Sequence, residues 1–197
     1  VGGFDFAARP GLPAPEQAVL WSPLVNPAVV MLTRPPDFLD QVPIPESHAI
    51  GACRDSAEGS YIVARGGAQD PFEVLVLPGN RPGDPLAALV PLDADTPGRV
   101  EALIRYWRAG RGKPVPADKR MTAQQRRRLR LMMQAADGRS DGASYREIGT
   151  ALFGRDRIAS EPWKTSALRD MVIGLVEGAT GLISGGYLQL LRHRRRS

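Results

Sequence analysis

The chain has 197 residues, of which 43% are hydrophobic and 24% are charged, and this composition indicates a folded globular protein rather than wholesale disorder. A single cysteine, Cys53, excludes an intrachain disulfide framework and fits a reducing compartment. The chain starts without the pattern of a secretory signal, and no apolar run approaches the roughly 18 residues that a membrane span needs. We therefore expect a cytoplasmic protein with no membrane partner.

Charge divides the chain into two unequal parts. Residues 113–197 contain 17 Lys and Arg against 8 Asp and Glu, a net charge of +9, whereas residues 1–112 contain 9 against 13, a net charge of −4. Such asymmetry indicates that one part meets a polyanion. Double-stranded DNA is the polyanion that we expect, because neutralisation of its phosphates by Lys and Arg dominates its affinity for proteins.

The first segment, residues 1–27, is expected to be an irregular N-terminal arm. Five prolines interrupt regular backbone hydrogen bonding there. Leu20 and Trp21 are the residues by which this arm could dock on the rest of the protein.

Residues 28–112 form a strand-rich part. Short apolar runs with β-branched and aromatic residues, bounded by Gly, Pro and Asp, predict three or four strands. The runs are residues 28–32, 60–65, 72–77 and, shorter, 86–92. Residues 66–70, with two glycines, predict a hairpin turn between the second and third strands.

A helix over residues 98–108 is expected to cover this small antiparallel sheet. Val100, Leu103, Ile104 and Trp107 recur at helical spacing and predict an apolar face that packs on the strands. Glycines and prolines from Gly110 onward indicate a linker. The fold class is therefore α+β: a small antiparallel sheet with a covering helix, followed by a helical C-terminal part.

Residues 117–197 are predicted to be that helical part, with a basic tail. Thr122 is the expected N-cap of a first helix, which ends at Asp137-Gly138. Its inward residues are expected to be Leu129, Met132, Met133 and Ala136. Ser144 caps a second, short helix, with Glu147 at the distance of a capping box. Its inward residues are expected to be Tyr145, Ile148, Ala151 and Leu152.

A polar stretch, residues 155–161, leads to Pro162 and a long third helix over about 163–183. Trp163 is expected to belong to the core. The inward seam of the helix is expected to be Leu168, Val172, Leu175, Ala179 and Leu182. Gly174, Gly178 and Gly181 weaken this helix and allow a bend or a close approach of a neighbouring helix.

The short capped helix and the basic start of the next one have the pattern of a helix-turn-helix, whose second helix presents its first residues to DNA. Gly149 is small at the place where the second helix should cross. The connection of about eight residues exceeds the three or four of a compact motif. The residues expected on the solvent side, facing bases or phosphates, are Lys164, Thr165, Ser166 and Arg169. Those expected to hold the DNA backbone are Arg126, Arg127, Arg130, Arg155, Arg157, Arg192, Arg194, Arg195 and Arg196.

Four stretches of this part resemble a proteobacterial family long catalogued only as a domain of unknown function. They are residues 144–148, 152–154, 163–170 and 185–192, and the likeness extends more weakly over residues 28–192. Members of that family resemble helix-turn-helix proteins, and some act as activators or anti-activators of the excision and transfer of integrative and conjugative elements. The resemblance implies transcriptional control by DNA binding, or an anti-activator that binds a related regulator protein and has no operator of its own.

Catalytic and metal-binding patterns are weak. His48 and Cys53 could form an imidazole–thiol pair, but a lone structural cysteine is the commoner case. Asp93 and Asp95 are expected to be turn residues before a helix. With no cluster of metal ligands and no phosphate-binding loop, we expect no enzyme, no cofactor and no metal. Twofold operators are common among such regulators, so a homodimer is the default expectation.

Overall fold

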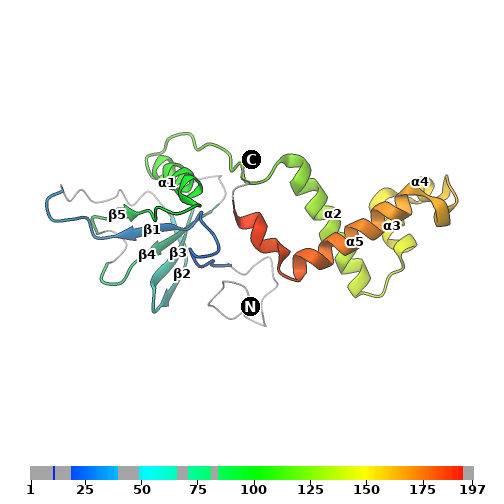
Figure 1. Cartoon of the computed structure of the whole chain (residues 1–197), viewed down its shortest axis with the longest axis horizontal. Coiled ribbons are helices and arrows are strands. Elements are labelled where there is room, and N and C mark those ends of the chain that lie inside the picture. Colours follow the sequence, from blue (N-terminus) through cyan, green and yellow to red (C-terminus); the bar gives the residue numbers. More distant parts are fainter. Residues whose placement is uncertain (1–10, 12–18, 40–48, 66–70, 81–83, 193–197) are drawn as a thin grey trace. The chain divides into compact units, whose positions relative to one another are not determined.

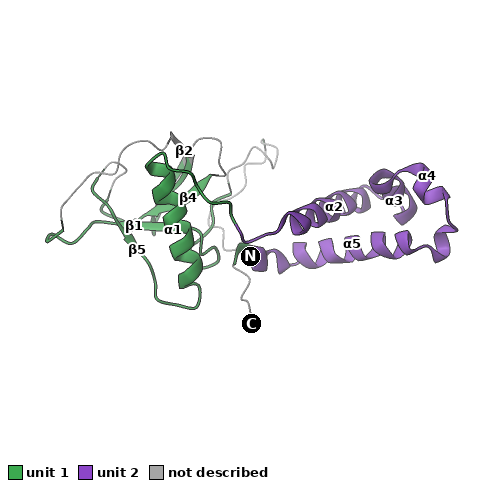
Figure 2. Cartoon of the chain, turned by 90° about the horizontal axis from the view of Figure 1, so that it is seen from above, with its two compact units in different colours: residues 1–118, 191–197 green, residues 119–190 purple. Residues whose placement is uncertain are grey.

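The computed structural model describes residues 11, 19–39, 49–65, 71–80 and 84–192. It divides into two compact units (Figure 2): unit 1 comprises residues 1–118 and 191–197, and unit 2 comprises residues 119–190. Leu191 and Arg192, the last described residues, thus belong with unit 1. No helix of the described chain combines the length and apolar character needed to cross a membrane.

Unit 1 contains the five-stranded sheet that makes the protein α+β (Figure 1). Its strands, in chain order, are β1 Val30–Thr33, β2 Ala49–Ser56, β3 Gly59–Arg65, β4 Phe72–Val76 and β5 Ala87–Leu89. They lie in the order β2-β3-β4-β1-β5. All neighbours are antiparallel except β1 and β4, which pair in parallel with Val30 opposite Val74. The sequence predicted an antiparallel sheet, and the sheet is antiparallel except for the β1–β4 pair.

The hairpin expected from the sequence is present. β3 and β4 pair antiparallel, with Tyr61 opposite Leu75; its predicted turn, residues 66–70, lies outside the described residues. A second hairpin, β2–β3, was not predicted. It turns into β3 at Gly59, whose φ of 134° and contact with the Val76 carbonyl leave no room for a side chain.

Alternation along the strands produces two apolar faces. Val30, Leu32, Ile62, Val74 and Val76 belong to one buried cluster, which includes Ala102 of α1 (Thr96–Gly110). Intervening residues face the other way, and the buried Tyr61 and Leu75 there pack with Leu20 and Val29. The described part of the arm thus covers the second face, as expected, and the backbone N–H of Trp21 donates to a Glu73 carboxylate oxygen at 3.1 Å.

The covering helix α1 packs on the sheet with a face that differs from the predicted one. Of the four residues predicted to face the strands, Leu103 packs against the buried cluster and the other three do not. The buried residues of α1 include Arg99, Ala102 and Arg105, while Val100, Ile104 and Trp107 are 40%, 49% and 47% exposed. Trp107 is therefore not a core residue. Arg111 and Lys113 lie over its ring, with Lys113 Nζ 4.7 Å from the ring centroid. Two arginines of α1 can be buried because each finds oxygen partners in the segments that flank the strands and the helix, as described below.

Unit 2 is entirely helical. Its elements are α2 Ala123–Ser140, α3 Tyr145–Phe153, α4 Arg155–Ala159, the 3₁₀ helix η2 Trp163–Thr165, α5 Ala167–Ile183 and the 3₁₀ helix η3 Gly186–Leu191. Two boundaries differ from those predicted: α2 continues through Gly138 to Ser140, and the long α-helix begins at Ala167 and not at Trp163. The polar stretch before Pro162 contains the unpredicted helix α4.

The core of unit 2 lies where α2, α3 and α5 meet. Met132, Ala135, Ile148, Val172, Leu175 and Ala179 are buried together, with Trp163 packed against them. The predicted seam of α5 and the core position of Trp163 are therefore confirmed. Two residues predicted to point inward do not: Met133 is 66% exposed, and Ala151 is also exposed.

Two glycines allow the close packing of these helices. A Cβ at Gly178 of α5 would lie 2.6 Å from Met132 Cε of α2, which confirms the close approach expected there. A Cβ at Gly149 of α3 would lie 3.1 Å from both Ile158 Cδ1 and Trp163 Cη2. Gly149 thus allows α4 and η2 to pack closely on α3. These two elements form the connection that was predicted to be a loop.

Candidate nucleic-acid interface

The most basic surface of unit 2 is the first half of α2. Thr122 starts the helix with a capping box: its Oγ1 accepts from Gln125 N at 3.1 Å, and its N–H donates to Gln125 Oε1 at 2.8 Å. The cap defines where the helix begins. In the first two turns after it, the side chains of Arg126, Arg127 and Arg130 are exposed. Arg128, which the prediction omitted, is exposed as well.

These arginines have no acidic neighbours in sequence, because residues 119–136 contain six Lys and Arg and no Asp or Glu. Among the described residues, Arg127, Arg128 and Arg130 form no ion pair, and Arg126 uses one guanidinium N–H to donate to the Met121 carbonyl at 3.1 Å. Exposed, unneutralised guanidinium groups of this kind are suited to phosphate oxygens. The uninterrupted basic run was the signal that could have added Arg128 to the predicted site.

The opposite end of the unit is formed by α3, α4 and η2. Ser144 caps α3 with a second capping box, in which its N–H donates to Glu147 Oε2 at 2.8 Å. These bonds lower the pKa of the Glu147 carboxyl below its ordinary value, the backbone N–H of Ser144 contributing most. Gly154, with φ of 90°, is the single residue between α3 and α4. The exposed side chains of Arg155 and Arg157 follow it.

The four residues predicted to meet bases divide between two elements. Lys164 and Thr165 are exposed on η2, and Arg169 is half-buried in the first turn of α5, with Nη1 3.4 Å from Asp170 Oδ1. Ser166 is a correction: it is 5% exposed, and its Oγ accepts from the backbone N–H of Leu168 at 3.0 Å. It caps α5 and does not lie on the solvent side, because the helix starts one residue after it.

The long helix α5 has a less basic outer surface than α2. Arg169 is its one cation, whereas Asp170 and Glu177 are exposed on it. Charge therefore favours α2, α4 and η2 over the body of α5 as the surface for a polyanion.

The structure separates the predicted residues into two clusters. α2 and α5 lie side by side and run in opposite directions (Figures 1 and 2), with Gly178 against Met132. Arg126 precedes Met132 by six residues and Arg169 precedes Gly178 by nine, so their positions differ by roughly 22 Å along the helices, at about 1.5 Å per residue. Arg126, Arg127 and Arg130 thus form one cluster, and the cations of α4, η2 and the start of α5 form the other.

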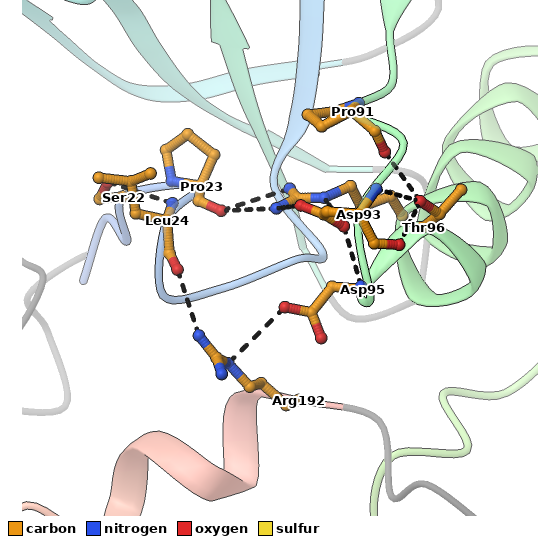
Figure 3. Close-up of polar contacts among 9 residues, drawn as sticks. Ser22, Pro23, Leu24, Pro91, Asp93, Asp95, Thr96 and Arg192 are labelled. Carbon is orange, nitrogen blue, oxygen red and sulfur yellow. Dashed lines mark hydrogen bonds and ion pairs between the residues drawn. The ribbon is translucent and has the colours of Figure 1, made fainter.

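Arg192 belongs to neither cluster. It lies in unit 1, where its Nε is 3.8 Å from Asp95 Oδ2 and its Nη2 donates to the Leu24 carbonyl at 3.5 Å (Figure 3). Asp95 is the N-cap residue of α1. The predicted tail residues Arg194, Arg195 and Arg196 lie outside the described residues.

The two aspartates before α1 have the structural role that the sequence predicted. Asp93 accepts from Arg99 Nη2 at 3.1 Å and from the backbone N–H of Asp95 at 2.9 Å. The Arg99 hydrogen bond is the main reason that the pKa of Asp93 lies below its ordinary value.

No group of described residues has the composition of a metal site. Burial raises the pKa of the Cys53 thiol, and the charge of Asp55 raises it further, so the thiolate that a nucleophile requires is disfavoured. Its proposed partner, His48, lies outside the described residues.

Comparison with known proteins gives the site its context. None of the curated proteins with which the chain was compared matches it. A protein-family model described as "T6SS, Transcription factor, DNA binding domain", that of the RovC DNA-binding domain, matches residues 89–192, or 104 of the 197 residues. This segment begins at Leu89, the last residue of β5, and contains α1 and the whole of unit 2. The chain belongs to this family of transcription-factor DNA-binding domains.

Proposed function

We propose that this DNA-binding regulator holds the phosphate backbone of duplex DNA with the exposed arginines of α2 and meets base edges with the residues of α4, η2 and the start of α5. The observation that carries the proposal is the first cluster: exposed arginines, in a stretch without a single acidic residue, inside the segment matched by the DNA-binding family. Phosphate contacts of this kind supply most of the affinity of DNA-binding proteins.

The second cluster has the mixed chemistry that base recognition needs. Arg155, Arg157 and Lys164 can donate to guanine or to phosphate, and the Thr165 hydroxyl can donate or accept. Ser166 is not included, because its side chain is buried and caps α5.

The distance between the clusters supports a division of labour. At about 3.4 Å per base pair, the separation of roughly 22 Å corresponds to roughly six base pairs. The two clusters would therefore contact different positions along a duplex. Backbone contacts at one end would orient the other end for sequence recognition.

The test is a salt series of affinity for promoter fragments and for random DNA. The triple variant R126Q/R127Q/R130Q should reduce the slope of log K against log salt by about 2.7, since each phosphate contact contributes about 0.9. R34Q is the control: Arg34 is exposed, lies in unit 1 and is outside the family-matched segment. An unchanged slope in the triple variant would exclude α2 from the interface.

A second comparison separates the roles of the two clusters. K164A and R169A should lower the preference for the specific fragment over random DNA, because each lost base contact costs about 1–3 kcal/mol of discrimination. A footprint of R169A that is unchanged in position and strength would remove Arg169 from the recognition surface.

The genes under control are addressed by the choice of fragments. The family description names T6SS, and the resemblance noted from the sequence names the transfer of integrative and conjugative elements. Promoters of both kinds belong in the assay. The resemblance is the basis for proposing control of a mobile element or an anti-activator role, and general expectation is the basis for a homodimer. If the protein prefers no DNA fragment, the result favours the anti-activator.

A further inference from the structure

Unit 2 contains an apolar groove outside the proposed interface, and the core residues Met132 and Ala179 form part of its lining. The groove has a volume of about 290 Å³ and lies between α2, α5 and η3. Its lining is Leu129, Met132, Met133, Ala136, Ala179, Leu182, Ile183, Tyr187 and Leu190. All of these belong to unit 2, and none carries a charge.

The groove walls include large apolar side chains that face solvent. Met133 is 66% exposed and Ile183 is 72% exposed. Covering such side chains stabilises a complex by roughly 25 cal/mol per Å² of apolar surface removed from water. Two methionines on one helix give the groove a wall that adapts to ligands of different shape.

Helical spacing places two cations of α2 next to residues of the groove lining, although neither cation is itself part of the lining. Arg126 precedes Leu129 by three residues and Arg130 precedes Met133 by three, and residues three apart are neighbours on a helix surface. No acidic residue precedes Asp137 on α2 to neutralise them. An apolar groove with a positive rim is complementary to a molecule that has an apolar body and one anionic group.

We propose that this groove binds a small amphiphilic anion, with its hydrocarbon or aromatic body against the methionine and leucine side chains and its carboxylate or similar group paired with Arg126 or Arg130. The volume is close to the roughly 300 Å³ at which small-molecule pockets begin, and sites between helices are typical of them. A folded protein partner would need a surface of roughly 800 Å² on each side, which exceeds a groove of this size.

The ligand and DNA would use the same guanidinium groups. An anion held by Arg126 or Arg130 neutralises charge that phosphates would otherwise meet, so bound ligand should weaken DNA binding. This consequence rests on the proposed function, whereas binding of the ligand does not.

The test measures binding of decanoate, below its micelle-forming concentration, to the full chain by calorimetry, with decan-1-ol as the uncharged counterpart. Met133→Glu places an acid in the groove wall, and Gln134→Glu makes the same charge change at an exposed neighbour outside it. We expect Met133→Glu to weaken decanoate binding by about tenfold or more, and Gln134→Glu to leave it nearly unchanged. R126Q/R130Q should weaken decanoate binding about tenfold and leave that of decan-1-ol unchanged.

Three results would overturn the proposal: no binding of decanoate, equal effects of Met133→Glu and Gln134→Glu, or equal effects of R126Q/R130Q on acid and alcohol. Both glutamate variants alter exposed positions, and a thermal melt checks that each is folded. Fluorescence anisotropy of labelled DNA then separates the two proposals. Decanoate binding to a chain that binds no DNA would contradict the proposed function and leave the groove site supported.

Discussion

Arginine side chains are buried in one helix of unit 1 and exposed in one helix of unit 2. In α1 of unit 1, Arg99 and Arg105 are 9% and 8% exposed, and both form hydrogen bonds with other segments of the unit. In α2 of unit 2, Arg126, Arg127 and Arg130 are exposed. The same residue type at helical spacing therefore serves structure in one helix and is available for a partner in the other.

The difference lies in the oxygen atoms that each arginine meets. Both Nη atoms of Arg99 donate to the Pro23 carbonyl at 3.3 Å, and Nη2 also donates to Asp93. Arg105 donates from Nε to the Pro116 carbonyl at 3.0 Å and lies over the Phe72 ring. A buried guanidinium is stable only with such partners, and one partner of Arg99, the Pro23 carbonyl, is 76 residues away along the chain. Net charge alone does not distinguish these roles.

The largest effect should come from removing a buried arginine. Arg99→Met should lower the free energy of unfolding by about 2–3 kcal/mol. The change removes the charge-assisted hydrogen bonds of the guanidinium group and leaves the Pro23 carbonyl without a donor. Arg127→Met, the same change at an exposed site, should alter it by less than about 0.5 kcal/mol. Urea unfolding measures both, and equal losses would end the distinction between the two helices.

Unit 2 should instead be sensitive where its helices touch. Gly149→Val should cost about 1–3 kcal/mol, because the added side chain meets Ile158 and Trp163 at 3.1 Å. Gly174→Ala should stabilise the protein by up to about 1 kcal/mol, since a Cβ there has no neighbour within 4 Å among the described residues. Thermal and urea unfolding of both variants tests whether the close helix contact at Gly149 is needed for the stability of the unit.

A smaller loss is expected at the helix caps of unit 2. Ser144→Ala removes the acceptor for Glu147 N and should cost about 1 kcal/mol, a typical value for a lost N-cap. Thr122→Ala at the start of α2 should have a similar effect. If neither variant changed the urea midpoint, the caps would not be what fixes the start of the two helices.

The smallest effect is a dependence on pH. The folded-state pKa of Glu147 lies below its ordinary value of 4.5, so its contribution to stability is present above that value. It is lost as the pH falls through the folded-state pKa. The stability difference between the protein and its Glu147→Gln variant should therefore shrink in acid below pH 4.5. A difference that stays constant or grows there would contradict the capping role of the carboxylate.

Local patterns predicted the parts of the fold that depend on neighbouring residues. The alternation of residues 60–65 and 72–77 predicted the hairpin of β3 and β4, and the spacing of Ser144 and Glu147 predicted the capping box of α3. The seam of α5 was predicted because its apolar residues have one dominant spacing. For the candidate site, the excess of arginine was evident, but its division into two clusters required the antiparallel pairing of α2 and α5.

The sequence by itself determined that this protein has an acidic, strand-rich half and a basic, helical half, because composition and short-range periodicity are properties of the chain alone. Only the tertiary structure decided which face of α1 is buried, that β1 pairs in parallel with β4, and that Ser166 is a buried cap. For α1 and the β1–β4 pair the physical reason is distance along the chain, whereas Ser166 is a cap because α5 begins at Ala167 and not at Trp163. The deciding partner, such as the Pro23 carbonyl that receives Arg99 from 76 residues away, lies outside any local window. Burial of a polar group follows from where its hydrogen-bond partner sits and not from its own polarity.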